Sequence, residues 1–182
     1  RLIAELTAEP AGPVTVTGIE KKKENKNAPL LYNLAELQND CSKYFKISPD
    51  ETLRIVQELY EKKMTTYPRT DARVLSTAVA KEIHKNIGGL RSYALATPFA
   101  KEVLEQGTYK NIAKTRYVND KQITDHYAII PTGQGLNNLA GLAPTAAKVY
   151  EVIVRRFLSI FYPPAVYQKF SLTVKVKEEN FF

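Results

Sequence analysis

The sequence predicts a mainly α-helical fold with some β structure, in which a helical domain is inserted into a β-rich domain. Strand-like alternation is found near the two ends, at residues 14–20 and 170–176, and the residues between them show helical periodicity. An insertion is the simplest arrangement that gives this order. Residues 1–27 and 163–182 would then be the first and last segments of the β-rich domain, and residues 28–162 would form the helical domain.

Both terminal patterns are those of strands. "VTVTGIE" (14–20) alternates β-branched residues with small or polar ones. "FSLTVKV" (170–176) alternates in the same way and would be half-buried, with one apolar face. The polar run "KKKENKN" (21–27) is expected to connect the two domains, as a solvated linker or as a strip facing phosphates. The apolar face of the second strand consists of Phe170, Leu172, Val174 and Val176.

Five segments of the middle block carry helix signals. Asn33, Ser48 and Ser76 can each cap a first turn, and Pro49 suits the first helical position after Ser48. The five predicted helices cover residues 33–45, 48–63, 76–87, 97–107 and 144–162. One face of the second helix is expected to consist of Leu53, Val56, Leu59, Tyr60 and Lys63.

Residues 108–143 show no clear periodicity and are rich in Gly, Asn, Asp and Thr. A loop of this length in a compact domain is usually functional or disordered. Several short helices joined by basic loops would fit a DNA-binding domain of the helix-turn-helix or winged-helix type.

The charge balance favours a polyanionic partner. The chain has 182 residues, a net charge of +7 and a sequence pI of about 9.4. Lysine and arginine side chains placed against phosphates release condensed counterions, so an excess of them suits nucleic acid. The single cysteine, Cys41, excludes a disulfide framework and a cysteine-based zinc site, and two histidines leave little scope for a transition-metal site.

No membrane association is expected, because no stretch approaches the roughly 18 apolar residues of a transmembrane helix. The first residues, "RLIAELTAEP", lack the charged-then-apolar order of a signal peptide, so the cytoplasm is the expected compartment. Both ends are expected to be cuts through a larger protein.

The segment "MTTYPRTDARVL" (64–75) contains a candidate nucleophile, Tyr67. A phenol with a pKa of about 10 is a weak nucleophile at neutral pH, but a neighbouring cation favours the phenolate and neutralises an attacked phosphate. Pro68 disfavours helical backbone at Tyr67, so an extended segment would place Tyr67 and Arg69 on the same side. Arg69 can bind phosphate through two parallel hydrogen bonds, and Asp71 could orient it. The alternative is a tyrosine that only packs in a turn.

A second candidate, His126, lies within "QITDHYAIIPTG" (122–133). A lone histidine is more often structural than functional, but this one lies in a long polar region between Asp125 and an aromatic residue. His84, in contrast, fits an ordinary polar position on a helix.

Four separated motifs resemble those of the type IA DNA topoisomerases. The tyrosine motif "LYEKKMTTYPRTDARVLS" (59–76) and the histidine motif "TDHYAIIPT" (124–132) occur in the order found in that family. Further similarity lies before them, in "APLLYNLAELQ" (28–38), and after them, in "VYEVIVRRFLSIFYPPAVY" (149–167). Proline after the tyrosine is similar to the topoisomerase III branch of the family.

The resemblance implies a role for each matching residue. Tyr67 would attack a DNA phosphodiester, form a 5′-phosphotyrosine link and release a 3′-hydroxyl. Arg69 would contact the scissile phosphate, and His126 would bind or position the strand near the break. The remaining motif residues would contact DNA or support the catalytic groups, and they are Gln57, Glu61, Thr70, Asp71 and Thr132.

The resemblance also implies the surroundings of this site. The helical domain would be a winged-helix-like (CAP-like) domain that bears the tyrosine, and the β-rich segments would be edges of an arch domain. The enzyme would cleave and religate one strand, preferably of single-stranded DNA, without ATP, at the nucleoid in the cytoplasm. No D-x-D cluster occurs in this chain, so no metal ligand is expected here. Mg²⁺ would be bound by a separate toprim domain, and this chain alone would be inactive.

Three other classes of protein share parts of this pattern. A tyrosine recombinase would need an R…H-x-x-R set before a tyrosine near its C-terminus, whereas here Tyr67 precedes His126 and H-x-x-R is absent. A non-catalytic winged-helix DNA-binding module would not need both motifs. A purely structural helical domain would need neither.

Overall fold

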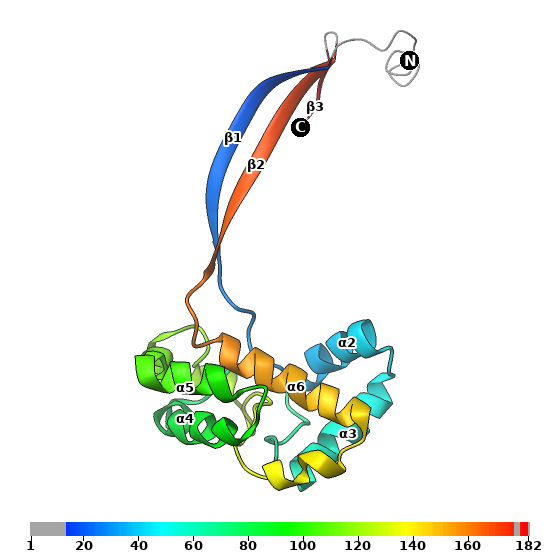
Figure 1. Cartoon of the computed structure of the whole chain (residues 1–182), viewed down its shortest axis with the longest axis vertical. Coiled ribbons are helices and arrows are strands. Elements are labelled where there is room, and N and C mark those ends of the chain that lie inside the picture. Colours follow the sequence, from blue (N-terminus) through cyan, green and yellow to red (C-terminus); the bar gives the residue numbers. More distant parts are fainter. Residues whose placement is uncertain (1–13, 177–178, 182) are drawn as a thin grey trace. The chain divides into compact units, whose positions relative to one another are not determined.

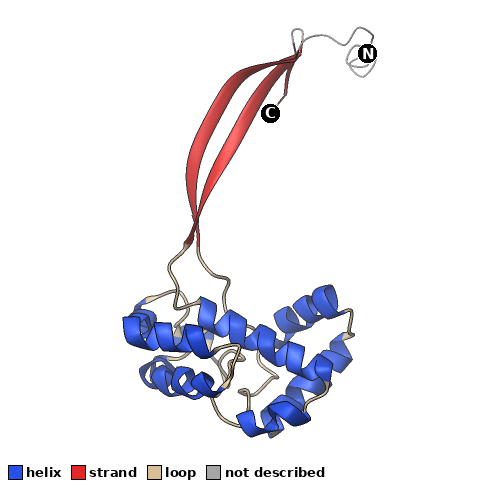
Figure 2. Ribbon diagram, in the orientation of Figure 1, coloured by secondary structure: helices blue, strands red, loops and turns tan. Residues whose placement is uncertain are grey.

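The structure, a computed structural model, describes residues 14–176 and 179–181. The chain divides into two compact units, one formed by Arg1–Asn27 with Pro164–Phe182 and the other by Ala28–Pro163. Figure 2 shows long strands in the first unit and helices in the second. The prediction of a mainly helical fold with some β structure is confirmed.

The first unit is an antiparallel ribbon of two long strands (Figure 1). β1 (Val14–Lys26) pairs with β2 (Ala165–Val176), and the short β3 (Glu179–Phe181) pairs with the other edge of β2. The register places Lys22 opposite Lys169.

This ribbon differs from the prediction in two respects. The polar run 21–27 is not a connector, because residues 21–26 continue β1 and pair with residues 165–170. Phe170 and Leu172, which were expected to be half-buried, are 53% and 51% exposed. Strand pairing satisfies backbone groups whatever the side chains are, so polar residues can extend β1. In the described part of the chain the sheet consists of β1, β2 and the short β3, and Phe170 and Leu172 stay exposed on it.

The helical unit is built from α-helices close to the predicted positions. The side chains of Asn33, Ser48 and Ser76 accept hydrogen bonds from backbone N–H groups three residues later, so all three predicted N-caps are confirmed. The helices are α2 (Leu34–Phe45), α3 (Pro49–Glu61), α4 (Thr77–Gly89), α5 (Thr97–Gln106) and α6 (Pro144–Ser159). Figure 1 shows α6 extending between the pair α2–α3 and the pair α4–α5. None of the described helices is long and apolar enough to cross a membrane.

Long-range hydrogen bonds and short turns hold residues 108–143. The Tyr117 hydroxyl donates to the Ala28 carbonyl at 2.7 Å, and the Leu75 N–H donates to the Tyr117 carbonyl at 2.8 Å. Strand-like pairing within Ala28–Pro163 consists of isolated bridges, so the winged-helix detail stays a prediction. The 3₁₀ turns of the unit are η1 (Leu90–Ser92), η2 (Thr108–Lys114), η3 (Asp120–Gln122) and η4 (Leu136–Gly141).

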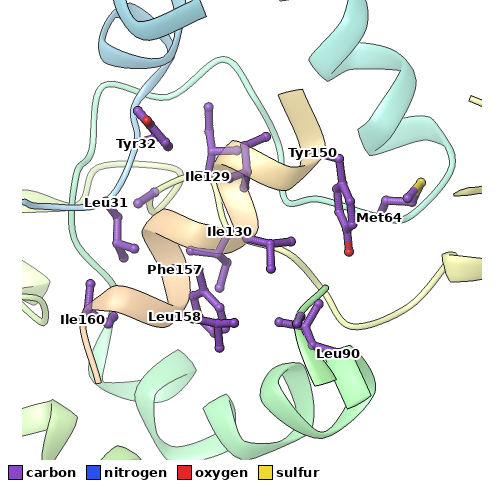
Figure 3. Close-up of a cluster of buried hydrophobic side chains, with 14 of the residues drawn as sticks. Leu31, Tyr32, Met64, Leu90, Ile129, Ile130, Tyr150, Phe157, Leu158 and Ile160 are labelled. Atoms are coloured by element: carbon purple, nitrogen blue, oxygen red, sulfur yellow. The ribbon is translucent and has the colours of Figure 1, made fainter. Parts of the chain in front are cut away.

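The apolar core of the helical unit contains the end of the histidine motif. Ile129 and Ile130 are 1% and 0% exposed, and Figure 3 shows their side chains among those of Tyr150 and Phe157 of α6. Full burial of such a side chain stabilises the fold by roughly 1.5–3 kcal/mol. These two isoleucines therefore fix the segment that follows His126.

A partly buried polar network holds residues 30–32, which lie beside the histidine motif. Arg156 of α6 pairs with Asp40 of α2 at 2.8 Å and donates to the Leu30 carbonyl at 2.9 Å. The Tyr32 hydroxyl donates to the same Asp40 carboxylate at 2.5 Å. Burial raises the pKa of the Tyr32 hydroxyl far above its usual value. The Tyr32 carbonyl accepts the Ile129 N–H at 2.8 Å, so the network also positions the histidine motif.

Candidate active site

The tyrosine motif leaves the end of α3 and pairs with the histidine motif. Thr66 N–H donates to the Ile130 carbonyl at 3.0 Å, and Thr132 N–H donates to the Met64 carbonyl at 3.0 Å. The pairing is antiparallel. Two segments that lie far apart in the sequence are thereby aligned, and this alignment sets the position of Tyr67 just beyond Thr66.

Two threonine hydroxyls reinforce the pairing. Thr66 Oγ1 donates to the Ala128 carbonyl at 3.0 Å and accepts the Ile130 N–H at 3.0 Å. Thr132 Oγ1 donates to the Lys63 carbonyl at 2.5 Å. Thr132, which was predicted as a site residue, therefore contacts the backbone of the tyrosine motif directly.

Glycines bring the loop after Thr132 against the ends of α3 and α4. Gly135 has a φ of 69°, and a Cβ added there would lie 2.3 Å from the Lys62 carbonyl oxygen. A Cβ on Gly89, at the end of α4, would lie 2.1 Å from the Gly133 carbonyl oxygen. Backbone approach this close excludes any side chain at these two positions. The loop after Thr132 is therefore packed closely against the ends of these two helices.

Three rings form a contiguous aromatic cluster. The Tyr67 and His126 ring centroids are 4.3 Å apart with an interplanar angle of 37°, and Tyr60 presents its edge to Tyr67 at 5.4 Å. The buried Thr70 hydroxyl donates to the His126 carbonyl at 3.2 Å. Residues of the tyrosine motif thus hold the histidine in place on both its ring and its backbone.

The cluster borders a cavity of about 580 Å³. Tyr67 is half-buried and His126 is exposed. The cavity is lined by Tyr60, Glu61, Lys63, Thr65, Thr66, Tyr67, His126, Tyr127, Thr132 and Gln134.

The structure brings together most of the residues predicted for the site. Tyr67, His126, Glu61 and Thr132 all line the cavity. Gln57 lies one turn earlier on α3 and donates to the Glu61 carboxylate at 3.1 Å. Sequence spacing on one helix and pairing of two motifs together account for this convergence.

Arg69 and Asp71 lie differently from the prediction. Both are exposed, and neither is among the residues that line the cavity. The chain bends at Pro68 and Arg69, and the Thr70 N–H donates to the Pro68 carbonyl at 3.0 Å. The alternation of an extended strand is therefore not kept, and Arg69 does not share the cavity with Tyr67. Within residues 14–176 and 179–181, the two side chains form no ion pair with each other.

Several cavity residues were not predicted. Tyr60 and Lys63 were expected to share one face of the second helix with Leu53, Val56 and Leu59, and no role in the site was predicted for them; Tyr60 is 40% exposed and Lys63 is also exposed. The helix ends at Glu61, so helical periodicity does not reach Lys63. The sequence signal that could have indicated Lys63 as a site residue is its position inside the tyrosine motif. α3 instead buries Thr52, Ile55, Val56 and Leu59.

Tyr127 and Gln134 were also missed, although each lies within two residues of a predicted site residue. Tyr127 is half-buried, and this burial raises the pKa of its hydroxyl above the usual value.

The donor set of the cavity does not fit a divalent cation. Among the described residues that line the cavity, Glu61 alone carries a carboxylate. No group of three or more His, Cys, Asp or Glu side chains able to hold a metal ion occurs in the described part of the chain. Mg²⁺ prefers near-octahedral oxygen coordination, which one carboxylate does not provide.

Tyr67 and His126, from two separate motifs, lie side by side in the helical unit. The sequence family described as DNA topoisomerase matches residues 1–182. The chain belongs to the DNA topoisomerase family.

Several of its relatives are proteins named DNA topoisomerase 3. The chain is 38% identical over 170 residues to DNA topoisomerase 3 of Bacillus cereus, covering 92% of this chain and 22% of that protein. It is 35% identical over 182 residues to DNA topoisomerase 3 of Bacillus subtilis, covering 100% of this chain and 24% of that protein. The chain thus spans about a quarter of the length of these relatives.

The fold is similar to part of full-length topoisomerase I from Thermotoga maritima, with a TM-score of 0.61 and 20% sequence identity. The similarity covers 93% of this chain and 26% of that protein. At this identity the likeness concerns the fold alone.

Proposed function

We propose that this chain is the part of a type IA DNA topoisomerase that carries the catalytic tyrosine, and that Tyr67 is its nucleophile. The observation that carries the proposal is the position of Tyr67, which lines a cavity with its ring 4.3 Å from that of His126. Tyr67 is half-buried and lines this cavity, so packing does not enclose it completely.

The proposed reaction exchanges one phosphate ester for another. The Tyr67 oxygen attacks a phosphorus of the DNA backbone and loses its proton, and the bond between phosphorus and the 3′ oxygen breaks. The 3′ oxygen takes up a proton and becomes a hydroxyl, while the 5′ phosphate stays on Tyr67. The reverse steps reseal the strand. No ATP is consumed, because the tyrosine ester retains the energy of the broken bond.

The other predicted residues support this reaction in different ways. Arg69, which is exposed at the bend next to Tyr67, would contact the scissile phosphate from outside the cavity, and Asp71 would lie beside the bound strand. His126 would bind or position the strand at the cavity mouth. The remaining residues would act at the cavity wall or through hydrogen bonds to its backbone, and they are Gln57, Glu61, Thr70 and Thr132.

The wider protein follows from the same proposal. Its substrate would be DNA, preferably single-stranded, whose phosphates suit a chain with a net charge of +7. The helical unit would be the winged-helix-like domain and the ribbon an edge of the arch domain. Mg²⁺ would be held outside this chain by a toprim domain, so the isolated chain would not relax DNA. The protein would act at the nucleoid in the cytoplasm.

The test is covalent capture of DNA by the full-length protein that contains this chain. A single-stranded oligonucleotide is labelled at its 3′ end, because a 5′-phosphotyrosine link keeps that piece on the protein. With Mg²⁺ present, we expect the parent to form a labelled adduct and the Tyr67→Phe variant to form none, while both bind the oligonucleotide with similar affinity. If the phenylalanine variant still forms the adduct, another residue is the nucleophile.

A further inference from the structure

Lys63 adopts a backbone conformation that ordinary side chains avoid. Its φ is 60°, and among the described residues other than glycine it shares a positive φ only with Lys46. For a residue with a Cβ this left-handed region is unfavourable, and glycine is its usual occupant. The surroundings impose the conformation, because Lys63 N–H donates to the Tyr60 carbonyl at 2.8 Å and the Lys63 carbonyl accepts from Thr132.

Lys63 is a positively charged residue of the cavity wall. The described residues that line the cavity include no lysine or arginine other than Lys63, and Arg69 is not among them. Within residues 14–176 and 179–181, no ion pair involves Lys63, and the nearby Glu61 carboxylate accepts from Gln57. Lys63 therefore lines the same cavity as Tyr67 and His126, and it is exposed and so accessible to an anion.

A simpler explanation is that Lys63 only interacts with the end of α3, because cations are favourable near helix C-termini. Lys46 allows this explanation to be separated from a role in the cavity. It is an exposed lysine at the end of α2, its φ is 58°, and its N–H donates to the Ser42 carbonyl at 3.1 Å. Lys46 does not line the cavity. The two lysines thus differ mainly in what their side chains face.

We infer that Lys63 is a phosphate-binding residue of the tyrosine site, whose ammonium contacts a backbone phosphate of the strand next to the bond that Tyr67 attacks. The inference rests on the proposed function. A flexible lysine acts on phosphate as a mobile point charge, which suits a strand that must be bound, cut and resealed in the same cavity. The site would then have two cations, Lys63 before Tyr67 in the sequence and Arg69 after it.

The test compares Lys63→Gly with Lys46→Gly in the full-length protein. Both variants lose one positive charge and place glycine where the backbone favours it, so neither should lower the thermal unfolding midpoint. Binding of a fluorescent single-stranded oligonucleotide is measured by anisotropy over a range of salt concentrations. Loss of one phosphate contact should lower the salt slope by about 0.7 and weaken binding about five-fold in 0.1 M salt. We expect this for Lys63→Gly and no change for Lys46→Gly.

Two further variants complete the design. Lys63→Gln keeps the Cβ and the strained backbone but removes the charge, so it should bind as weakly as Lys63→Gly, whereas Lys63→Arg should keep the parent slope. Equal slopes for Lys63→Gly and Lys46→Gly would overturn the inference. Adduct formation is measured in parallel: an adduct that persists in Tyr67→Phe refutes the proposed function, whereas a normal Tyr67 dependence with an unchanged Lys63→Gly slope refutes the role of Lys63 alone.

Discussion

Replacing Thr66 with valine removes one hydroxyl from the junction of the two motifs with little change in shape. Thr66 Oγ1 donates to Ala128 and accepts from Ile130, both at 3.0 Å, and both partner residues are 0% exposed. Each hydrogen bond contributes about 1 kcal/mol, and a buried group left without a partner costs about 1–3 kcal/mol. For two such groups we expect Thr66→Val to lower the free energy of unfolding by about 2–4 kcal/mol.

Urea and thermal unfolding, followed by circular dichroism of the helices, measure this loss. A loss of this size should lower the unfolding midpoint by about 5–15 °C in a domain of this length. Thr66→Ser is the matched control, because it keeps the hydroxyl and removes only a methyl group, for which we expect a loss of about 1 kcal/mol. A valine variant at least as stable as the serine variant would show that the hydroxyl does not hold the motifs together.

Two other substitutions or modifications test the packing around the site. Gly135→Ala should destabilise the helical unit, because its methyl group would lie 2.3 Å from the Lys62 carbonyl oxygen, whereas Gly88→Ala, with nothing within 4 Å, should be neutral or stabilise by about 0.5–1 kcal/mol in urea unfolding. Equal stabilities would contradict the close approach. Burial raises the pKa of the Cys41 thiol to about 11, so between pH 7 and 9 it stays protonated and should react with a thiol reagent only after unfolding. Reaction of the native protein at the rate of a free thiol would refute this burial.

The helices were predictable because their signals are local. Each N-cap signal depends on residues within one helical turn. The side chains of Asn33, Ser48 and Ser76 all accept hydrogen bonds from N–H groups three residues later. The extent of β1 was not predictable in the same way. Residues 21–26 carry a polar sequence typical of a linker, and only their pairing with residues 165–170 makes them a strand.

The site residues also differ in whether local sequence signals could predict their positions. Tyr67 and His126 could be proposed from their motifs, and the pairing of these motifs explains why they meet. The position of Arg69 could not, because one hydrogen bond from Thr70 to Pro68 bends the chain and ends the alternation on which the prediction depended. Lys63 was hidden for another reason: its left-handed backbone is imposed by contacts with residues some 70 positions later, including Thr132.

The central claim is that Tyr67 becomes linked to DNA, and mass spectrometry of the trapped adduct tests it most directly. After nuclease treatment and digestion with trypsin, the peptide of residues 64–69 contains one tyrosine. We predict that this peptide carries the mass of a nucleotide attached through phosphate, and that the modification is absent when Tyr67 is replaced by phenylalanine. A nucleotide found on a peptide containing any other tyrosine, with residues 64–69 unmodified, would contradict the claim.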